Sequence, residues 1–164
     1  MSQGGRTVYC IDTSILIDLH RLYPQGVFPS LWTHLEHLVG EGRAIAPREV
    51  LKELRRQDDW LTRWAKRQGG MFRSLDGKQL EAARKVVAQF PALAHAGRAT
   101  AAADPFLVAL ALAQKGESLF GSDYVVVSSE KRKRGGCRIP NVCDHYGIKC
   151  LSLLEFIEAE GWTF

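Results

Sequence analysis

The sequence predicts an α/β fold in which helices cover both sides of a mostly parallel central sheet. Short runs of β-branched and aromatic residues alternate with longer segments whose apolar residues recur at helical spacing. The run YVVVS at 124–128 is apolar on both faces, as expected for a central parallel strand. Strands separated by helices indicate βαβ units, which pair in parallel and place their helices on the faces of the sheet.

The individual elements follow from the same periodicities. We expect strands at 7–11, 43–46, 124–128 and 148–151. We expect helices at 14–22, 30–39, after Pro47, and at 58–67, 78–90, 104–115 and 153–160. Asp58 suits the N-cap of its helix, and Pro105 suits the first helical position of the apolar segment 104–115.

Length and composition indicate one ordinary globular domain over residues 1–164. Hydrophobic residues make up 46% of the chain and charged residues 24%, which is typical of soluble proteins. The apolar runs are too short to span a bilayer, and the N-terminus lacks a basic region followed by an apolar stretch. We therefore expect a cytoplasmic protein without a membrane partner, whose four cysteines are reduced.

The charge of the chain favours a polyanionic partner. The formal net charge is +4, the isoelectric point is about 9.0, and the positive residues are clustered. One cluster comprises Arg48, Lys52, Arg55 and Arg56. The other is a continuous block that we expect to hold substrate phosphates, with a solvated loop as the alternative: Lys131, Arg132, Lys133 and Arg134.

Four acids are placed where the active site of a parallel sheet is expected, beyond the carboxyl ends of the strands. Asp12 directly follows the first strand, and Glu130 lies two residues after the strand 124–128. Glu53 is on the helix after the second strand, and Asp104 begins a buried helix. We expect the four side chains to converge on one edge of the sheet.

Such a cluster of carboxylates requires a positive counter-charge, because like charges in a shared site repel. Hard oxygen ligands suit Mg²⁺ or Mn²⁺ better than zinc. These cations activate water and polarise a phosphodiester. In this interpretation the acids bind a metal and the basic residues bind phosphate. The combination therefore points to phosphoryl chemistry.

Each acid also has a structural alternative. Asp12 and Asp104 each stand where an N-cap of the following helix would stand. Glu53 would be a solvated helix residue, and Glu130 would pair with the adjacent basic block.

Two segments resemble the first half of a known family pattern. The segment YCIDTSILID at 9–18 resembles the opening strand of PIN domains, in which the first metal-binding Asp precedes Thr or Ser. The resemblance implies that Asp12 is a ligand and that Thr13 and Ser14 are supporting hydroxyls. The segment IAPREVLKEL at 45–54 resembles the second motif and selects Glu53 over Glu49.

Two later segments extend the resemblance over nearly the whole chain. The segment AADPFLVALA at 102–111 resembles the third PIN motif, with Asp104 as its acid. The segment VVVSSE at 125–130 resembles the fourth, which implies a supporting hydroxyl at Ser128 and a fourth acid at Glu130. The family usually has Asp at this last position, so Asp123 and Asp144 are alternative candidates.

The C-terminal segment 138–151 resembles a subgroup of largely uncharacterised PIN-like proteins, related to toxin ribonucleases of virulence-associated-protein C type. The resemblance implies a three-layer α/β/α sandwich, an endoribonuclease that uses Mg²⁺ or Mn²⁺, and frequent homodimers. It further implies that RNA is the substrate, that the chain is the toxin of a toxin–antitoxin pair, and that a cognate antitoxin blocks the acidic pocket. A structure-specific DNA nuclease and a non-catalytic RNA-binding PIN domain are the alternatives.

Two other groups of residues have simpler interpretations than a ligand site. Three cysteines and a histidine lie within 14 residues, but without the close Cys pair typical of structural zinc: Cys137, Cys143, His145 and Cys150. Trp60 and Trp64 share a helix face, where burial is favoured over stacking on bases.

Overall fold

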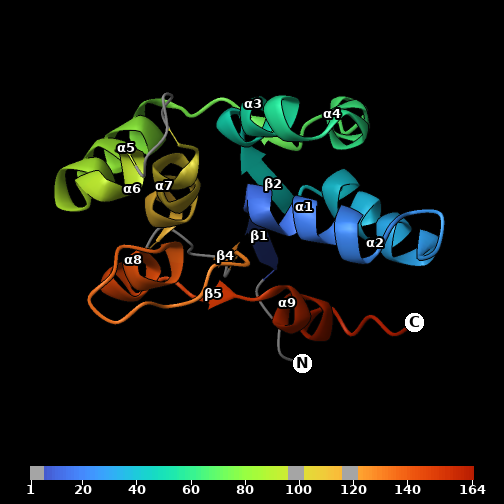
Figure 1. Cartoon of the computed structure of the whole chain (residues 1–164). Helices are drawn as coiled ribbons and strands as arrows, with labels where there is room; N and C mark the ends of the chain where they lie inside the picture. The colour runs from blue at the N-terminus through green and yellow to red at the C-terminus, as the bar shows by residue number, and fades with distance from the viewer. Residues whose placement is uncertain (1–5, 96–101, 116–121) are drawn as a thin grey trace.

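The computed structural model describes residues 6–95, 102–115 and 122–164, and shows a three-layer α/β/α sandwich. The five strands of its central sheet are all parallel and lie in the order β3-β2-β1-β4-β5. Their bounds are β1 Thr7–Ile11, β2 Ala44–Pro47, β3 Phe72–Arg73, β4 Asp123–Val127 and β5 Cys150–Leu151. Figure 1 shows α5 to α8 on one side of this sheet and α1, α2 and α9 on the other.

The helices agree closely with the sequence periodicity. Their bounds are α1 Thr13–Leu22, α2 Pro29–Gly40, α3 Arg48–Gln57, α4 Asp59–Lys66, α5 Gly77–Gln89, α6 Pro91–His95, α7 Asp104–Gln114, α8 Ile139–Tyr146 and α9 Leu153–Ala159. The segments β3, α6 and α8 were not predicted. The strand at 7–11 is confirmed residue for residue, whereas the strand expected at 148–151 is reduced to its last two residues.

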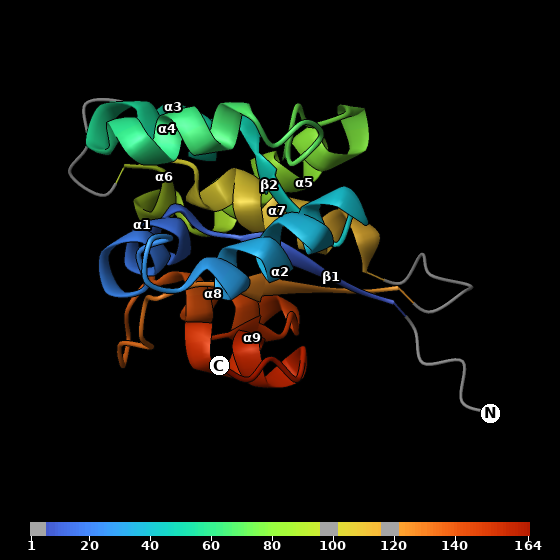
Figure 2. The ribbon, with the colours of Figure 1, turned by 90° about the vertical axis from the view of Figure 1, so that its right-hand side faces the viewer.

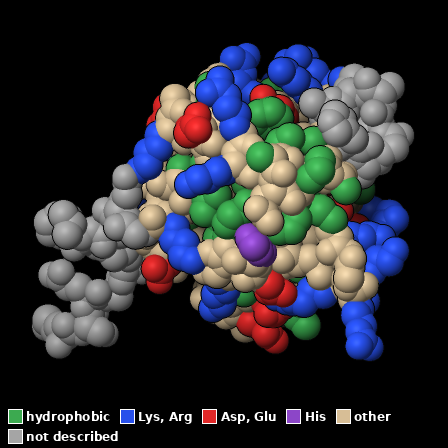
Figure 3. Space-filling view, turned by 90° about the vertical axis from the view of Figure 1, so that its left-hand side faces the viewer, with side chains coloured by type: hydrophobic (Ala, Val, Ile, Leu, Met, Phe, Trp, Pro, Cys, Tyr) green, Lys and Arg blue, Asp and Glu red, His purple; other side chains and the backbone are tan. Residues whose placement is uncertain are grey.

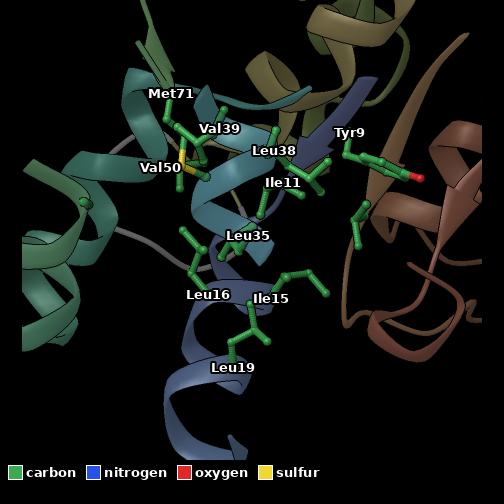
Figure 4. Close-up of a cluster of buried hydrophobic side chains, with 14 of the residues drawn as sticks. Tyr9, Ile11, Ile15, Leu16, Leu19, Leu35, Leu38, Val39, Val50 and Met71 are labelled. Atoms are coloured by element: carbon green, nitrogen blue, oxygen red, sulfur yellow. The ribbon is translucent and has the colours of Figure 1, made fainter. Parts of the chain in front are cut away.

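The core on one side of the sheet forms because alternate residues of β1 face opposite sides. Tyr9 and Ile11 face α1 and α2, and Figure 4 shows the apolar side chains of those helices converging on them. The buried residues drawn there include Ile15, Leu16 and Leu19 of α1 together with Leu35, Leu38 and Val39 of α2.

The core on the opposite side is built around α7. Val8 and Cys10 of β1 and Val126 of β4 pack in the same cluster as residues of α5, α6, α7 and α8. Eight of the eleven residues of α7 are buried, because this helix lies between the sheet and α5. This burial agrees with the sequence of the helix, which is apolar nearly all round.

Helix ends account for several boundaries. The side chain of Asp58 caps α4 by accepting a hydrogen bond from the backbone N–H of Leu61 at 2.8 Å, so this prediction is confirmed. The prediction for Pro105 was wrong by one position, because α7 begins at Asp104 and Ala103 occupies its N-cap. Gly147 ends α8 with a φ of 66°, a left-handed conformation that favours glycine.

The strand order contains a topological switch between β1 and β4. The chain builds outward from β1 to β2 and β3, then crosses to β4 and β5 on the other side of β1. The connections after β1 and β4 therefore leave the sheet in opposite directions, and a crevice is expected between their carboxyl ends. None of the helices in the described part of the chain is long and apolar enough to cross a membrane.

Candidate acidic active site

Asp12 lies at the carboxyl end of β1, directly beside the end of β4. Its backbone N–H donates to the carbonyl of Val127 at 3.0 Å. It occupies the N-cap position of α1, but its side chain makes no capping bond. Instead Oδ2 accepts hydrogen bonds from the hydroxyls of Ser14 at 2.5 Å and Ser128 at 2.9 Å. Two of the three predicted supporting hydroxyls therefore orient this carboxylate, which is only 4% exposed.

Glu53 extends from α3 into the space between the starts of α1 and α7. Its Oε2 accepts a hydrogen bond from the Thr13 hydroxyl at 2.6 Å, and its Oε1 accepts one from the backbone N–H of Ala103 at 2.9 Å. The side chain is 8% exposed, so it is not a solvated helix residue. Asp104 follows Ala103 directly and is 7% exposed, so this contact brings the third acid to the same edge of the sheet.

Glu130 closes the site from the segment after β4. Its backbone N–H donates to the Ser128 hydroxyl at 3.1 Å, and its Oε2 accepts a hydrogen bond from the backbone N–H of Ile139 at 2.8 Å. The neighbouring backbone N–H of Ser129 donates to the Ser14 hydroxyl at 3.0 Å. Hydroxyl groups thus connect the ends of β1 and β4, and they fix the course of the chain that carries Glu130.

The electrostatics of Asp12 show that two of the other acids act on it. Burial is the largest cause that raises the pKa of its carboxyl, from 3.8 to about 6. The hydrogen bonds from Ser14 and Ser128 oppose the shift, whereas the negative charges of Glu130 and Glu53 add to it. Three of the four predicted acids therefore share one electrostatic environment.

Cys137 relates Asp104 to this group. Burial raises the pKa of its thiol, a backbone hydrogen bond from Leu93 opposes the shift, and the charges of Asp104 and Glu130 raise it further. The thiol therefore lies near both acids. The sequence suggested Cys137 only as a zinc candidate, because no local pattern connects it with Asp104.

The two alternatives for the fourth acid lie elsewhere. Asp123 is the first residue of β4 and pairs with Thr7, so it is at the amino end of the sheet, opposite the site. Asp144 is exposed on α8 and binds the guanidinium of Arg132 through both carboxylate oxygens, at 2.7 and 2.9 Å. Glu130 is the candidate that approaches Asp12.

A basic hollow adjoins the acids. It encloses about 480 Å³ and is lined by Ser14, Ser129, Glu130, Lys131, Arg132, Lys133 and Arg138. Three of the four predicted phosphate-binding residues thus line it, while Arg134 is outside its described lining and Arg138 was not predicted. Figure 3 shows one face of the molecule, on which Lys and Arg side chains gather mainly at the margins and hydrophobic side chains lie toward the middle.

A family model matches residues 9–164, which is nearly the whole chain. The chain belongs to the DUF4411 family. This family is described as a domain of unknown function. No curated protein and no solved structure gives a significant match.

The donor set of this DUF4411 chain matches a hard cation in its chemistry, because its groups are carboxylates and hydroxyls. Within the described part of the chain, however, no three acidic, histidine or cysteine side chains are already arranged as a metal-binding group. Glu53 and Glu130 instead accept hydrogen bonds from hydroxyl and backbone donors. A cation at Asp12 would therefore have to replace some of these contacts.

The remaining cysteines and tryptophans have structural roles. Cys143 is buried in the core and hydrogen-bonded with Cys150, apart from the acids, while His145 packs edge-on against Phe90. Trp64 is fully buried and donates its indole N–H to Glu36 at 2.9 Å, in agreement with the favoured interpretation.

Proposed function

We propose that this protein is a metal-dependent endoribonuclease of PIN type, which hydrolyses RNA phosphodiester bonds with Mg²⁺ or Mn²⁺. The observation that carries the proposal is a buried Asp12 at the switch point of a parallel sheet, on which the negative charges of Glu53 and Glu130 act, with the buried Asp104 at the start of α7. Asp12, Glu53, Asp104 and Glu130 come from segments far apart in the chain, and the negative charges of Glu130 and Glu53 disfavour ionisation of Asp12, which favours a bound cation.

The residues of the proposed site have two roles: some are ligands of the cation, and others position those ligands. Asp12 and Asp104 would bind the cation directly, and Glu53 and Glu130 would bind it or orient water. When bound, such a cation polarises the phosphodiester and lowers the pKa of water. Ser14 and Ser128 keep the Asp12 carboxylate in place through the hydrogen bonds described above, which limits the reorganisation of this ligand on binding, whereas Thr13 holds Glu53 in the metal-free protein.

RNA as the substrate, a toxin–antitoxin role and a homodimer are further parts of the proposal. The basic hollow beside the acids supports a polyanionic substrate. The resemblance to toxin ribonucleases supports the toxin role, in which a cognate antitoxin would block the acidic site. A small neighbouring reading frame that encodes a DNA-binding motif would support the pair, and its consistent absence beside related genes would oppose it.

Cleavage assays test the proposed activity. Single-stranded RNA should be cut in the presence of Mn²⁺ and spared after chelation. Asp12→Asn and Asp104→Asn should each lower the rate at least about 100-fold, because each removes an anionic ligand with little change in shape. Asp123→Asn is the matched control: it removes an acid from the opposite edge of the sheet and should retain activity.

Each other outcome has a definite meaning. Cleavage of flap or hairpin DNA in preference to RNA would replace the proposal with a structure-specific DNA nuclease. RNA binding without cleavage in any divalent cation would indicate a non-catalytic RNA-binding domain. Full activity in a folded Asp104→Asn variant would remove Asp104 from the mechanism.

A further inference from the structure

The loop between β4 and α8, residues 128–138, is held in one shape although it has no regular secondary structure. The side chain of Asn141 on α8 binds the backbone of the loop through two hydrogen bonds. The N–H of Lys133 donates to Asn141 Oδ1 at 3.1 Å, and Asn141 Nδ2 donates back to the carbonyl of Lys133 at 3.0 Å. Figure 2 shows this loop at the end of the molecule opposite the start of β1.

Two glycines give the loop a tight turn next to these two hydrogen bonds. Gly135 has a φ of 68°, and the N–H of Gly136 donates to the carbonyl of Lys133 at 2.7 Å. A Cβ on Gly136 would approach the Lys133 Cβ to 2.8 Å and its carbonyl oxygen to 2.9 Å. The turn therefore depends on both glycines.

Two further contacts fix the loop on α8. Asp144 binds the guanidinium of Arg132 through two hydrogen bonds, and Glu130 accepts the N–H of Ile139 at the start of the helix. The loop is thus anchored at Glu130, Arg132 and Lys133. A loop that is already ordered before binding loses less conformational entropy when a ligand binds, so the free-energy cost of binding is smaller.

The hollow under this loop has the groups that bind a phosphate. Lys131, Lys133 and Arg138 supply positive charge, while the guanidinium of Arg132 is engaged by Asp144. Ser129 also lines the hollow, but its hydroxyl oxygen is buried, so the charge that meets a phosphate comes from the lysines and Arg138. Glu130 lines the hollow on the side of the acidic site.

We propose that Lys131, Lys133 and Arg138 form a preorganised subsite for a backbone phosphate of the polynucleotide, adjacent to the bond that is cut. Asn141 and Asp144 are positioning residues, which hold the loop in its binding shape and do not touch the substrate. The identity of the ligand rests on the proposed function. The arrangement of the loop does not depend on the proposed function.

Binding of a labelled single-stranded RNA, measured by fluorescence anisotropy with a chelator present, tests the subsite without cleavage. Arg138→Ala should weaken binding at least about fivefold and lower the salt slope by about 0.7, the loss of one single-strand phosphate contact. Arg134→Ala is the matched control, because it removes the same charge from the same loop but from outside the described lining. It should change the affinity less than about twofold.

Asp144→Asn tests the positioning role, because our proposal and net charge alone predict opposite changes in RNA affinity. Removal of a negative charge should tighten binding of an anion if only net charge matters. Because the substitution weakens the anchor of Arg132, our proposal expects weaker binding, by about fivefold, at an unchanged fold by circular dichroism. Asn141→Ala, which changes no charge, should weaken binding in the same way.

The outcomes separate this inference from the proposed function. Equal affinities of Arg138→Ala and Arg134→Ala would overturn the subsite, even if Asp12 and Asp104 prove essential for cleavage. Tighter binding by Asp144→Asn, or unchanged binding by Asn141→Ala, would overturn the positioning role. Loop-dependent binding of RNA that the wild-type protein never cleaves would leave the subsite standing and remove the nuclease.

Discussion

At the residue scale, Asp12 is the group whose environment says most about the site. Its carboxylate is buried beside two other acids, and two hydroxyl donors stabilise it only in part, so its pKa rises to about 6. In the metal-free protein, ionisation of Asp12 therefore opposes folding. The same environment favours a bound cation, which would compensate for the lost solvation and the repulsion.

The metal-free stability of Asp12→Asn tests this account. The folded pKa lies above the unfolded value of about 3.9, so between about pH 4 and pH 6 the unfolded chain loses the proton first and wild-type stability falls as pH rises. The variant lacks this loss and should be more stable at pH 7, by up to about 3 kcal/mol. Its advantage should disappear near pH 4.

Urea unfolding in the presence of a chelator, repeated from pH 4 to pH 7, provides the measurement. An Asn at this position retains a carbonyl that accepts the hydroxyls of Ser14 and Ser128, so lost hydrogen bonds should not mask the effect. A stability difference that does not vary with pH would contradict the raised pKa.

At the element scale, segments with clear apolar periodicity were predictable and segments without it were not. The strand 7–11 and the helices α1, α2 and α5 have strong periodicity, which local sequence alone encodes. Helix α8, IPNVCDHY, contains residues with weak helix propensity and forms because Val142 and Cys143 are buried in the core. Its boundary signals, Pro140 near the start and Gly147 at the end, would have revealed it.

The candidate site shows the same division. Asp12, Asp104 and Glu130 could be proposed because each follows a recognisable strand or begins a recognisable helix, whereas Glu53 was selected over Glu49 by the resemblance to the second PIN motif. Cys137 and Arg138 could not be connected with them, because the loop that carries them is positioned by contacts from Asn141 and Asp144. Contacts of this kind depend on the folded arrangement of α8, which no local pattern encodes.

A helix cap provides a test at this scale. Asp58→Ala should lower the free energy of unfolding by about 1 kcal/mol, because the N–H of Leu61 loses its acceptor at the start of α4. Asp59→Ala is the control: it removes a neighbouring acid that is the first residue of the helix and not its cap. Equal losses in the two variants, measured by urea unfolding, would show that general helix electrostatics, and not capping, accounts for the effect.

At the scale of the whole molecule, the site exists only in the folded chain. Its acids lie at positions 12, 53, 104 and 130, and the sheet order brings together the connections after β1 and β4 that carry two of them. A cation that uses these ligands would bind the folded state and not the unfolded one. Its binding free energy would therefore add to the stability of the protein by mass action.

These carboxylates are proposed to bind a divalent cation. Titration of Mn²⁺ into the metal-free protein at pH 7.5, followed by calorimetry, tests it without reference to any substrate. We expect saturable binding by the wild-type protein and by Asp123→Asn, and an affinity at least about tenfold lower in Asp104→Asn, since an anionic ligand is lost. No saturable binding by the wild-type protein, or equal binding by a folded Asp104→Asn variant, would contradict the claim.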